Sequence, residues 1–96
     1  MNGVPIPPPF DAPLEKVVTQ AKEDLAKRLA ININQVNLVE LQSVTWPDGS
    51  LGCPQPGMAY TQVTVDGLLI RLSAGANSYE YHSGGGRAPF LCESKS

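Results

Sequence analysis

The chain has 96 residues and a formal net charge of −2, which suits one small domain with little margin of stability. Acidic and basic residues are interspersed, so no basic stripe exists to neutralise phosphates, and this disfavours nucleic acid and anionic membrane surfaces as partners. No apolar run approaches the roughly 20 residues that span a bilayer.

Residues 1–10 form a proline-rich leader, with prolines at positions 5 and 7–9. Such a segment is expected to be extended and solvated. No Arg or Lys flanks it, so a stiff linker is favoured over an SH3-type ligand. The start lacks the charged and apolar regions of a secretory signal. Taken literally this indicates the cytoplasm, but a chain from which a signal was removed would look the same.

A helix is predicted from about Ala12 to Ala30. Asp11 is a good N-cap, and Pro13 and Glu15 suit the first turn. Its apolar positions repeat with helical spacing: Leu14, Val17, Val18, Ala21, Leu25 and Leu29. The charged residues occupy the other face, so one stripe is expected to pack on a core.

A long loop is predicted at Thr45–Gln62, between a first strand at Val36–Thr45 and later strands. Its prolines remove backbone donors and push the preceding residues out of the helical region. After it, β-branched residues alternate over Ala59–Val65. Asp66–Gly67 is a dipeptide typical of a tight hairpin turn, from which Leu68–Ala74 would return as the partner strand.

Two further strands are predicted at Ser78–Ser83 and Pro89–Glu93. The order of one helix followed by strands predicts an α+β domain. We expect an N-terminal amphipathic helix packed on a four- to five-stranded antiparallel sheet in two layers. The domain is expected to span residues 11–93, with the leader before it and a tail at 94–96.

No catalytic or metal-binding set is expected. One His and two Cys are too few and too far apart for a zinc site, and His82 is interpreted as a surface residue of a strand. Asp48 with Glu80 or Glu40 could pair for acid–base work, but such acids are usually turn formers or exposed strand residues. Gly84–Arg87 lacks the following helix of a phosphate loop. The chain is therefore expected to be no enzyme and to hold no cofactor.

The two cysteines lie in the long loop and near the C-terminus, where a bond between Cys53 and Cys92 could tie the tail to the loop. Such a bond would close about 40 residues and be worth on the order of 4 kcal/mol. Two free thiols in a reducing cytoplasm are the alternative.

The long loop also carries a candidate binding surface. Trp and Tyr are common anchors at interfaces, and the candidate residues are Trp46, Pro47, Pro54, Pro56, Met58 and Tyr60. The alternative, which we favour for Trp46, is that the indole covers one end of a core that has few other residues to close it.

Four segments together resemble a known pattern: Trp46–Met58, Tyr60–Gln62, Tyr79–His82 and Leu91–Cys92. They are similar to a family of small bacterial domains, often in exported proteins or lipoproteins, with no established biochemical function. The resemblance implies an extracytoplasmic domain, periplasmic, secreted or lipid-anchored, in which Cys53 pairs with Cys92. It implies no catalytic residues.

The expected architecture is similar to cystatin-like and PepSY-like domains, and cystatin-like domains include protease inhibitors. The inhibitor motif Gln-x-Val-x-Gly is missed by Gln62–Gly67, because Thr64 replaces Val and Gly67 comes one residue late. The leading hypothesis is a non-enzymatic, extracytoplasmic, monomeric binding or accessory domain whose partner is an unknown protein or envelope ligand. A protease-inhibitor-like module and a purely structural module are the alternatives.

Overall fold

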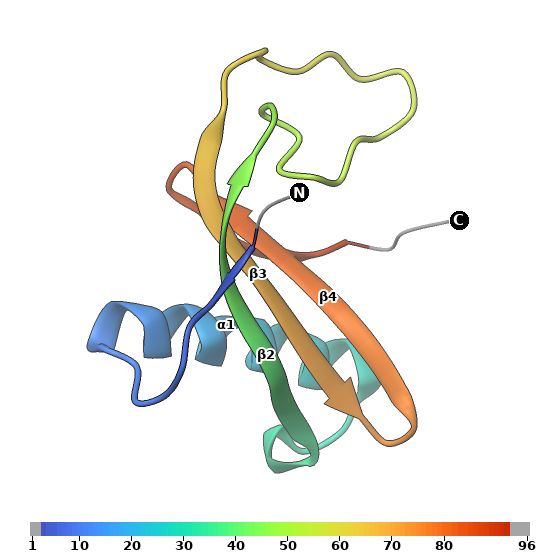
Figure 1. The fold of residues 1–96 in the computed structure, drawn as a ribbon. Coiled ribbons are helices and arrows are strands. Elements are labelled where there is room, and N and C mark those ends of the chain that lie inside the picture. Colours follow the sequence, from blue (N-terminus) through green and yellow to red (C-terminus); the bar gives the residue numbers. More distant parts are fainter. Residues whose placement is uncertain (1–2, 93–96) are drawn as a thin grey trace.

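One helix lies across one face of a five-stranded antiparallel sheet (Figure 1). The computed structural model describes residues 3–92. The strands are neighbours in chain order, β1 to β5. The elements are β1 (Val4–Pro5), α1 (Ala12–Leu29), the 3₁₀ helix η1 (Ile33–Gln35), β2 (Val36–Trp46), β3 (Val65–Ala74), β4 (Asn77–Gly84) and β5 (Arg87–Leu91). This arrangement confirms the predicted α+β fold.

The helix begins and ends where local chemistry predicts. Asp11 Oδ1 accepts a hydrogen bond from the Leu14 amide at 3.0 Å and so satisfies one free donor of the first turn. At the other end Ala30 adopts a left-handed conformation, and its N–H reaches the carbonyls of Ala26 and Lys27. Leu29, expected in the apolar stripe, is exposed instead because it lies in the last turn, next to this cap.

The main core lies between α1 and the sheet. Its fully buried members include Ala21, Leu25, Ile70 and Leu72. Tyr81 is also buried there, and its hydroxyl donates to Asp24 Oδ2 at 2.6 Å. Burial raises the pKa of the Asp24 carboxyl, but the hydrogen bonds from Tyr81 and Arg28 outweigh it and lower the pKa overall. The contact fixes the helix on β4.

The predicted hairpin at Asp66–Gly67 is wrong. Residues 59–64 form no strand, and both residues lie inside β3, which pairs with β2 across the long loop. Gly67 serves a different purpose. A Cβ there would lie 2.1 Å from Ser83 O and 2.5 Å from Trp46 Nε1. The position is glycine because the neighbouring strand and the indole approach closely, and not because the chain turns.

The leader is extended and mostly exposed, as expected, but it is part of the sheet and not a separate linker. Val4 and Pro5 pair with Ser43 and Gln42, and the Ile6 amide donates to Leu41 O at 2.9 Å. Ile6 and Phe10 pack against the main core. An apolar side chain every few residues therefore holds this segment on the domain.

The remaining strands follow the prediction. β3 and β4 are joined at Gly75–Ala76, and β4 and β5 at Gly85–Gly86. The last strand starts slightly earlier than expected, and Glu93 and the tail 94–96 lie outside the described residues. Within residues 3–92, no helix is long and apolar enough to cross a membrane.

Candidate functional site

The proline loop, residues 47–64, packs its first part, around Leu51, on the sheet face opposite α1. Side chains alternate along β4, so Tyr81 points to the helix and His82 to the opposite face. On that face a second apolar cluster gathers Val44, Trp46, Leu51 and Leu69, with Val65 and Phe90 packed against it. Figure 1 shows the loop beyond the end of the sheet, away from the helix. Leu51 belongs to the loop, so burial of its side chain holds the loop on the sheet.

Trp46 lies beneath the loop and not on its surface. Its exposed fraction is 0%, and its indole Nε1–H donates to Ser83 O at 2.8 Å. Gly52 of the loop approaches the ring so closely that a Cβ there would lie 2.4 Å from Trp46 Cζ3. Trp46 is therefore not part of an exposed binding surface. The loop packs over it, as in the alternative, but in a second apolar cluster on the sheet face opposite α1.

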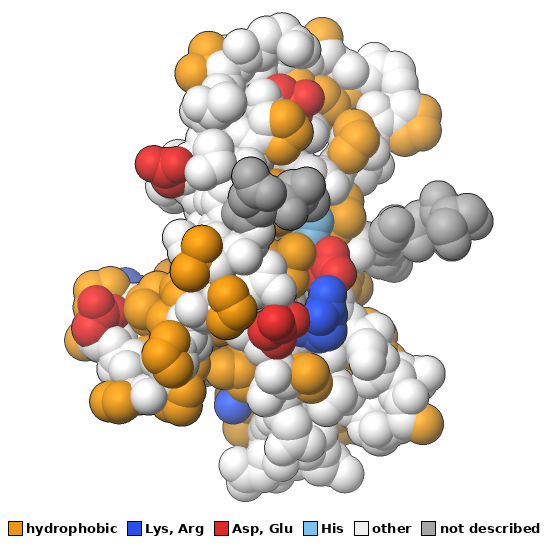
Figure 2. Space-filling view, viewed as in Figure 1, with side chains coloured by type: hydrophobic (Ala, Val, Ile, Leu, Met, Phe, Trp, Pro, Cys, Tyr) orange, Lys and Arg blue, Asp and Glu red, His pale blue; other side chains and the backbone are white. Residues whose placement is uncertain are grey.

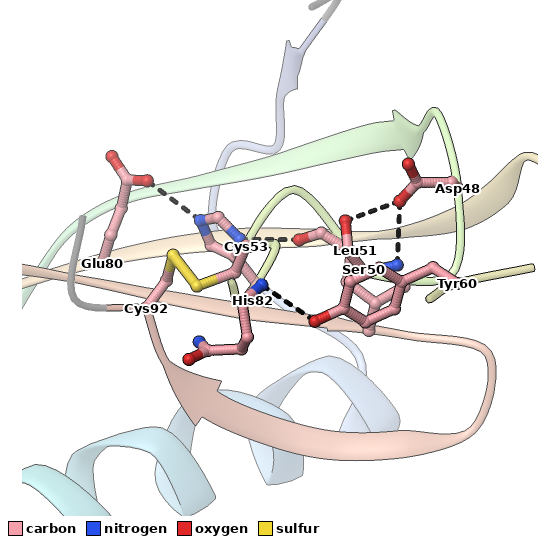
Figure 3. The surroundings of a disulfide bond; sticks show 9 residues. Asp48, Ser50, Leu51, Cys53, Tyr60, Glu80, His82 and Cys92 are labelled. Carbon is pink, nitrogen blue, oxygen red and sulfur yellow. Dashed lines mark hydrogen bonds and ion pairs between the residues drawn. A yellow bond between two sulfur atoms is a disulfide. The ribbon is translucent and has the colours of Figure 1, made fainter. Parts of the chain in front are cut away.

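A disulfide joins the loop to the end of the sheet (Figure 3). Cys53 and Cys92 are bonded, with their Cα atoms 5.8 Å apart and 39 positions apart in the sequence. Cys92 follows β5, and its amide donates to Glu80 O at 2.9 Å, which places it against β4. The pairing implied by the resemblance is confirmed, and two free thiols are ruled out in this structure.

His82 is buried, with an exposed fraction of 3%, so its interpretation as a surface histidine is wrong. Its ring stacks on Trp46 with 4.5 Å between centroids and meets the edge of Phe90 at 6.2 Å. Figure 3 shows the ring between loop and sheet: Nδ1 lies 2.7 Å from Leu51 O and Nε2 lies 2.9 Å from Glu80 Oε1. The residue connects the two parts of the site. The alternation along β4 could have placed it on the loop-covered face, but no sequence signal showed that the loop folds there.

A row of charged residues continues from His82 across the same face (Figure 2). Arg71 lies between two carboxylates, with Nη1 at 2.7 Å from Glu40 and Nη2 at 3.2 Å from Glu80. The hydrogen bond from His82 lowers the pKa of Glu80, partly opposed by burial and aided by Arg71. Glu40 and Glu80 both pair with the Arg71 guanidinium. Asp48 instead accepts a hydrogen bond from Ser50.

The loop is held by hydrogen bonds of its own. Asp48 Oδ1 accepts from the Ser50 amide at 2.9 Å and from its hydroxyl at 2.5 Å, and these bonds lower the pKa of Asp48. The Gly49 amide donates to Thr61 O at 2.9 Å, which ties the two ends of the loop together.

The outer part of the loop is exposed and apolar. We call Pro54, Pro56, Met58 and Tyr60 the loop tip. Met58 is 62% exposed and the two prolines are exposed, whereas Tyr60 is half-buried. The Gln55 amide donates to the Tyr60 hydroxyl at 2.9 Å, which links the two sides of the tip. Pro47 is exposed at the base of the loop, separate from the tip. The candidate surface is therefore smaller than the sequence predicted.

The cysteines and the histidine of the site are already engaged in contacts within the chain. Both cysteines are bonded to each other and both ring nitrogens of His82 have partners. Within residues 3–92, no group of three or more metal-ligating side chains is present. The Gly84–Arg87 segment is a turn between strands, and Arg87 donates from it to Gly49 O at 3.3 Å. The arrangement braces a loop.

The matched span of a family model covers nearly all of this site. The model is described as Domain of unknown function (DUF8738), and it matches residues 18–92. The chain belongs to this family. The DUF8738 span holds both cysteines, His82, Trp46 and the whole loop, and it begins inside α1. A search of curated proteins and a search of solved structures returned no match. The match is consistent with the expected uncharacterised small domain.

Proposed function

We propose that the chain is a non-enzymatic binding or accessory domain that contacts its partner through the loop tip. One observation carries the proposal: an exposed apolar tip stands on a loop whose base is fixed by the Cys53–Cys92 bond and by Leu51. A surface held in one conformation loses little conformational entropy when it binds, so more of the contact energy remains as affinity.

The tip favours a partner surface without strong charge. Between Asp48 and Asp66 the chain has no Asp, Glu, Lys, Arg or His. Aromatic residues and Met are enriched in the buried centres of protein interfaces, and Met58 and Tyr60 are of this kind. The proposed partner is therefore an uncharged patch on a protein or envelope ligand, and not a nucleic acid.

An oxidising location is part of the proposal. Disulfides form and persist outside the cytosol and are rare within it, and here the disulfide fixes the base of the proposed surface. We place the domain in an extracytoplasmic compartment on this ground.

A monomeric state is also proposed, because the edges of the sheet are poorly suited to pairing with a strand of another chain. Pro5 in β1 and Pro89 in β5 have no amide to donate to a further strand. The pairing of β2 with β3 shifts register between Leu38 and Glu40, and Val39, at this irregularity, is 55% exposed. Prolines and bulges at sheet edges hinder pairing with another chain.

Binding is tested with the labelled, oxidised domain and fractionated envelope extract. We expect one fraction to shift the backbone amides of residues 54–60 and leave those of α1 unchanged. Met58→Gln removes apolar contact at the tip while keeping the length of the side chain. It should weaken the purified complex by about tenfold or more, as for an interface hot spot.

The matched control is Val39→Thr, which changes an apolar residue of similar exposure in β2, outside the loop, and should bind like the wild type. The binding role is wrong if no fraction shifts the tip amides, or if Met58→Gln and Val39→Thr bind equally well.

A protease inhibitor is the second candidate, supported by the same braced loop, since a pre-shaped segment can enter a protease cleft with little entropy cost. Stoichiometric inhibition of one enzyme in a panel of cysteine, serine and metalloproteases is the expected result for this role, with residues 54–60 protected from cleavage. Full activity of every enzyme at saturating domain excludes it. A domain that fails both this assay and the binding assay is a structural module.

A further inference from the structure

The two ring nitrogens of His82 both face acceptor oxygens, so two ring protons are needed where a neutral imidazole has one. It is the one histidine of the chain. Nδ1 faces the Leu51 carbonyl and Nε2 faces a carboxylate oxygen of Glu80. A carbonyl only accepts, and so does an ionised carboxylate, whereas a neutral imidazole has a single N–H. Both contacts are hydrogen bonds only when the ring carries two protons or when Glu80 carries one.

Glu80 is the wrong place for the extra proton. Its carboxylate also accepts from Arg71 Nη2 at 3.2 Å. A guanidinium is always charged, and a cation this close stabilises the carboxylate as the anion. The extra proton therefore belongs to His82, whose stacking on the Trp46 face at 4.5 Å also suits a cation.

The other charged groups around the ring are already paired. Glu40 of β2 and Arg71 of β3 bind each other beyond Glu80. Arg87 of β5 lies over Phe90, with its guanidinium carbon 5.0 Å from the ring centroid, and donates to the loop. Asp48 of the loop is bonded to Ser50. The helix lies on the opposite sheet face, so Glu80 is the charged group in direct contact with the imidazole.

We propose that His82 is a proton-operated latch for the proline loop. The doubly protonated ring binds the loop at Leu51 and the sheet at Glu80 at once. When one proton leaves, an unprotonated nitrogen faces one of these oxygens, so that contact turns from attraction to repulsion. The loop is then held by fewer bonds, and its base opens more often as the pH rises. This inference concerns the loop conformation and holds whether or not the tip binds a partner.

The latch is tested on the wild-type oxidised domain by ring ¹⁵N spectra and loop amide exchange, from about pH 5 to about pH 9. A single histidine makes the ring signals unambiguous. We expect both ring nitrogens to be protonated at the acid end. The opening equilibrium of Leu51 and Cys53, corrected for intrinsic exchange, should rise by about tenfold with the same midpoint as the ring.

Glu80→Gln separates a latch from a purely structural contact. The amide introduced at position 80 can donate to the unprotonated Nε2, so a neutral ring satisfies both neighbours. The loop should then stay closed with little dependence on pH. Glu40→Gln removes the same charge from the same Arg71 without touching His82, and it should keep the wild-type profile. The latch is refuted if the ring is singly protonated at the acid end, or if loop opening does not change as the ring loses its proton. It is also refuted if Glu80→Gln keeps the wild-type pH profile of loop opening.

Discussion

Replacing Gly67 by alanine is expected to destabilise the domain by about 3 kcal/mol or more, at the upper end of what overpacking usually costs. The added Cβ would lie only 2.1 Å from Ser83 O and 2.5 Å from Trp46 Nε1. Neither atom can yield cheaply: Ser83 is held in the pairing of β4 with β3, and Trp46 is fully buried. Denaturant unfolding measures the loss, which corresponds to a fall in melting temperature of about 15 °C for a chain of this size.

Gly49→Ala is the matched control, because a Cβ there would meet Thr61 at the ordinary distance of 3.4 Å. It should be neutral or slightly stabilising, since alanine restricts the unfolded chain. Gly67→Asn distinguishes the two interpretations of this position. Asparagine is tolerated in a tight hairpin turn, so a mild effect would contradict the strand geometry, whereas the close approach of Trp46 predicts a loss larger than that of alanine.

Features that depend on residues close together in the sequence could be predicted. The helix follows from its cap at Asp11 and its apolar spacing, and the β3–β4 and β4–β5 connections follow from Gly75 and from Gly85–Gly86. Each depends on contacts between near neighbours, which a local pattern encodes. The α+β class then follows because a helix and a sheet, each with one apolar face, have few ways to bury both.

The partner of β2 could not be predicted locally. Asp66–Gly67 satisfies the rule for a hairpin turn, and Ala59–Val65 alternates as an exposed-edge strand would. The outcome was decided by a distant residue, because pairing β2 with β3 buries Trp46 over Gly67. Burial of a tryptophan side chain outweighs a turn preference, since such a residue removes a large apolar area from water.

The predictions for His82 and for the leader were wrong for a related reason. The alternation along β4 predicts that His82 and Tyr81 face opposite sides, but not that a loop covers the side of His82. Prolines at positions 5 and 7–9 suggested a separate linker, but Val4 and Pro5 pair with β2, and Ile6 and Phe10 are partly buried against the core. In each case the deciding contact joins segments far apart in the sequence.

The disulfide has the second large effect. Removing it by Cys53→Ser with Cys92→Ser is expected to cost about 4 kcal/mol, because the bond spans 39 positions and restricts the unfolded chain. A domain of this size has roughly 5–10 kcal/mol in total, so the variant should be marginally stable, and the amides of residues 47–64 should lose protection before those of α1 and β3. Denaturant unfolding and amide exchange measure the two effects.

Reduction of the wild type removes the same bond without changing a side chain, and it serves as the control for the serine substitutions. Both treatments should lower stability by the same amount and release the same residues. If reduced wild type loses less than about 1 kcal/mol, Leu51 and His82 hold the loop without the disulfide, and the bond no longer supports an oxidising compartment. A large loss in both means that the loop tip keeps its shape only where Cys53 and Cys92 stay oxidised.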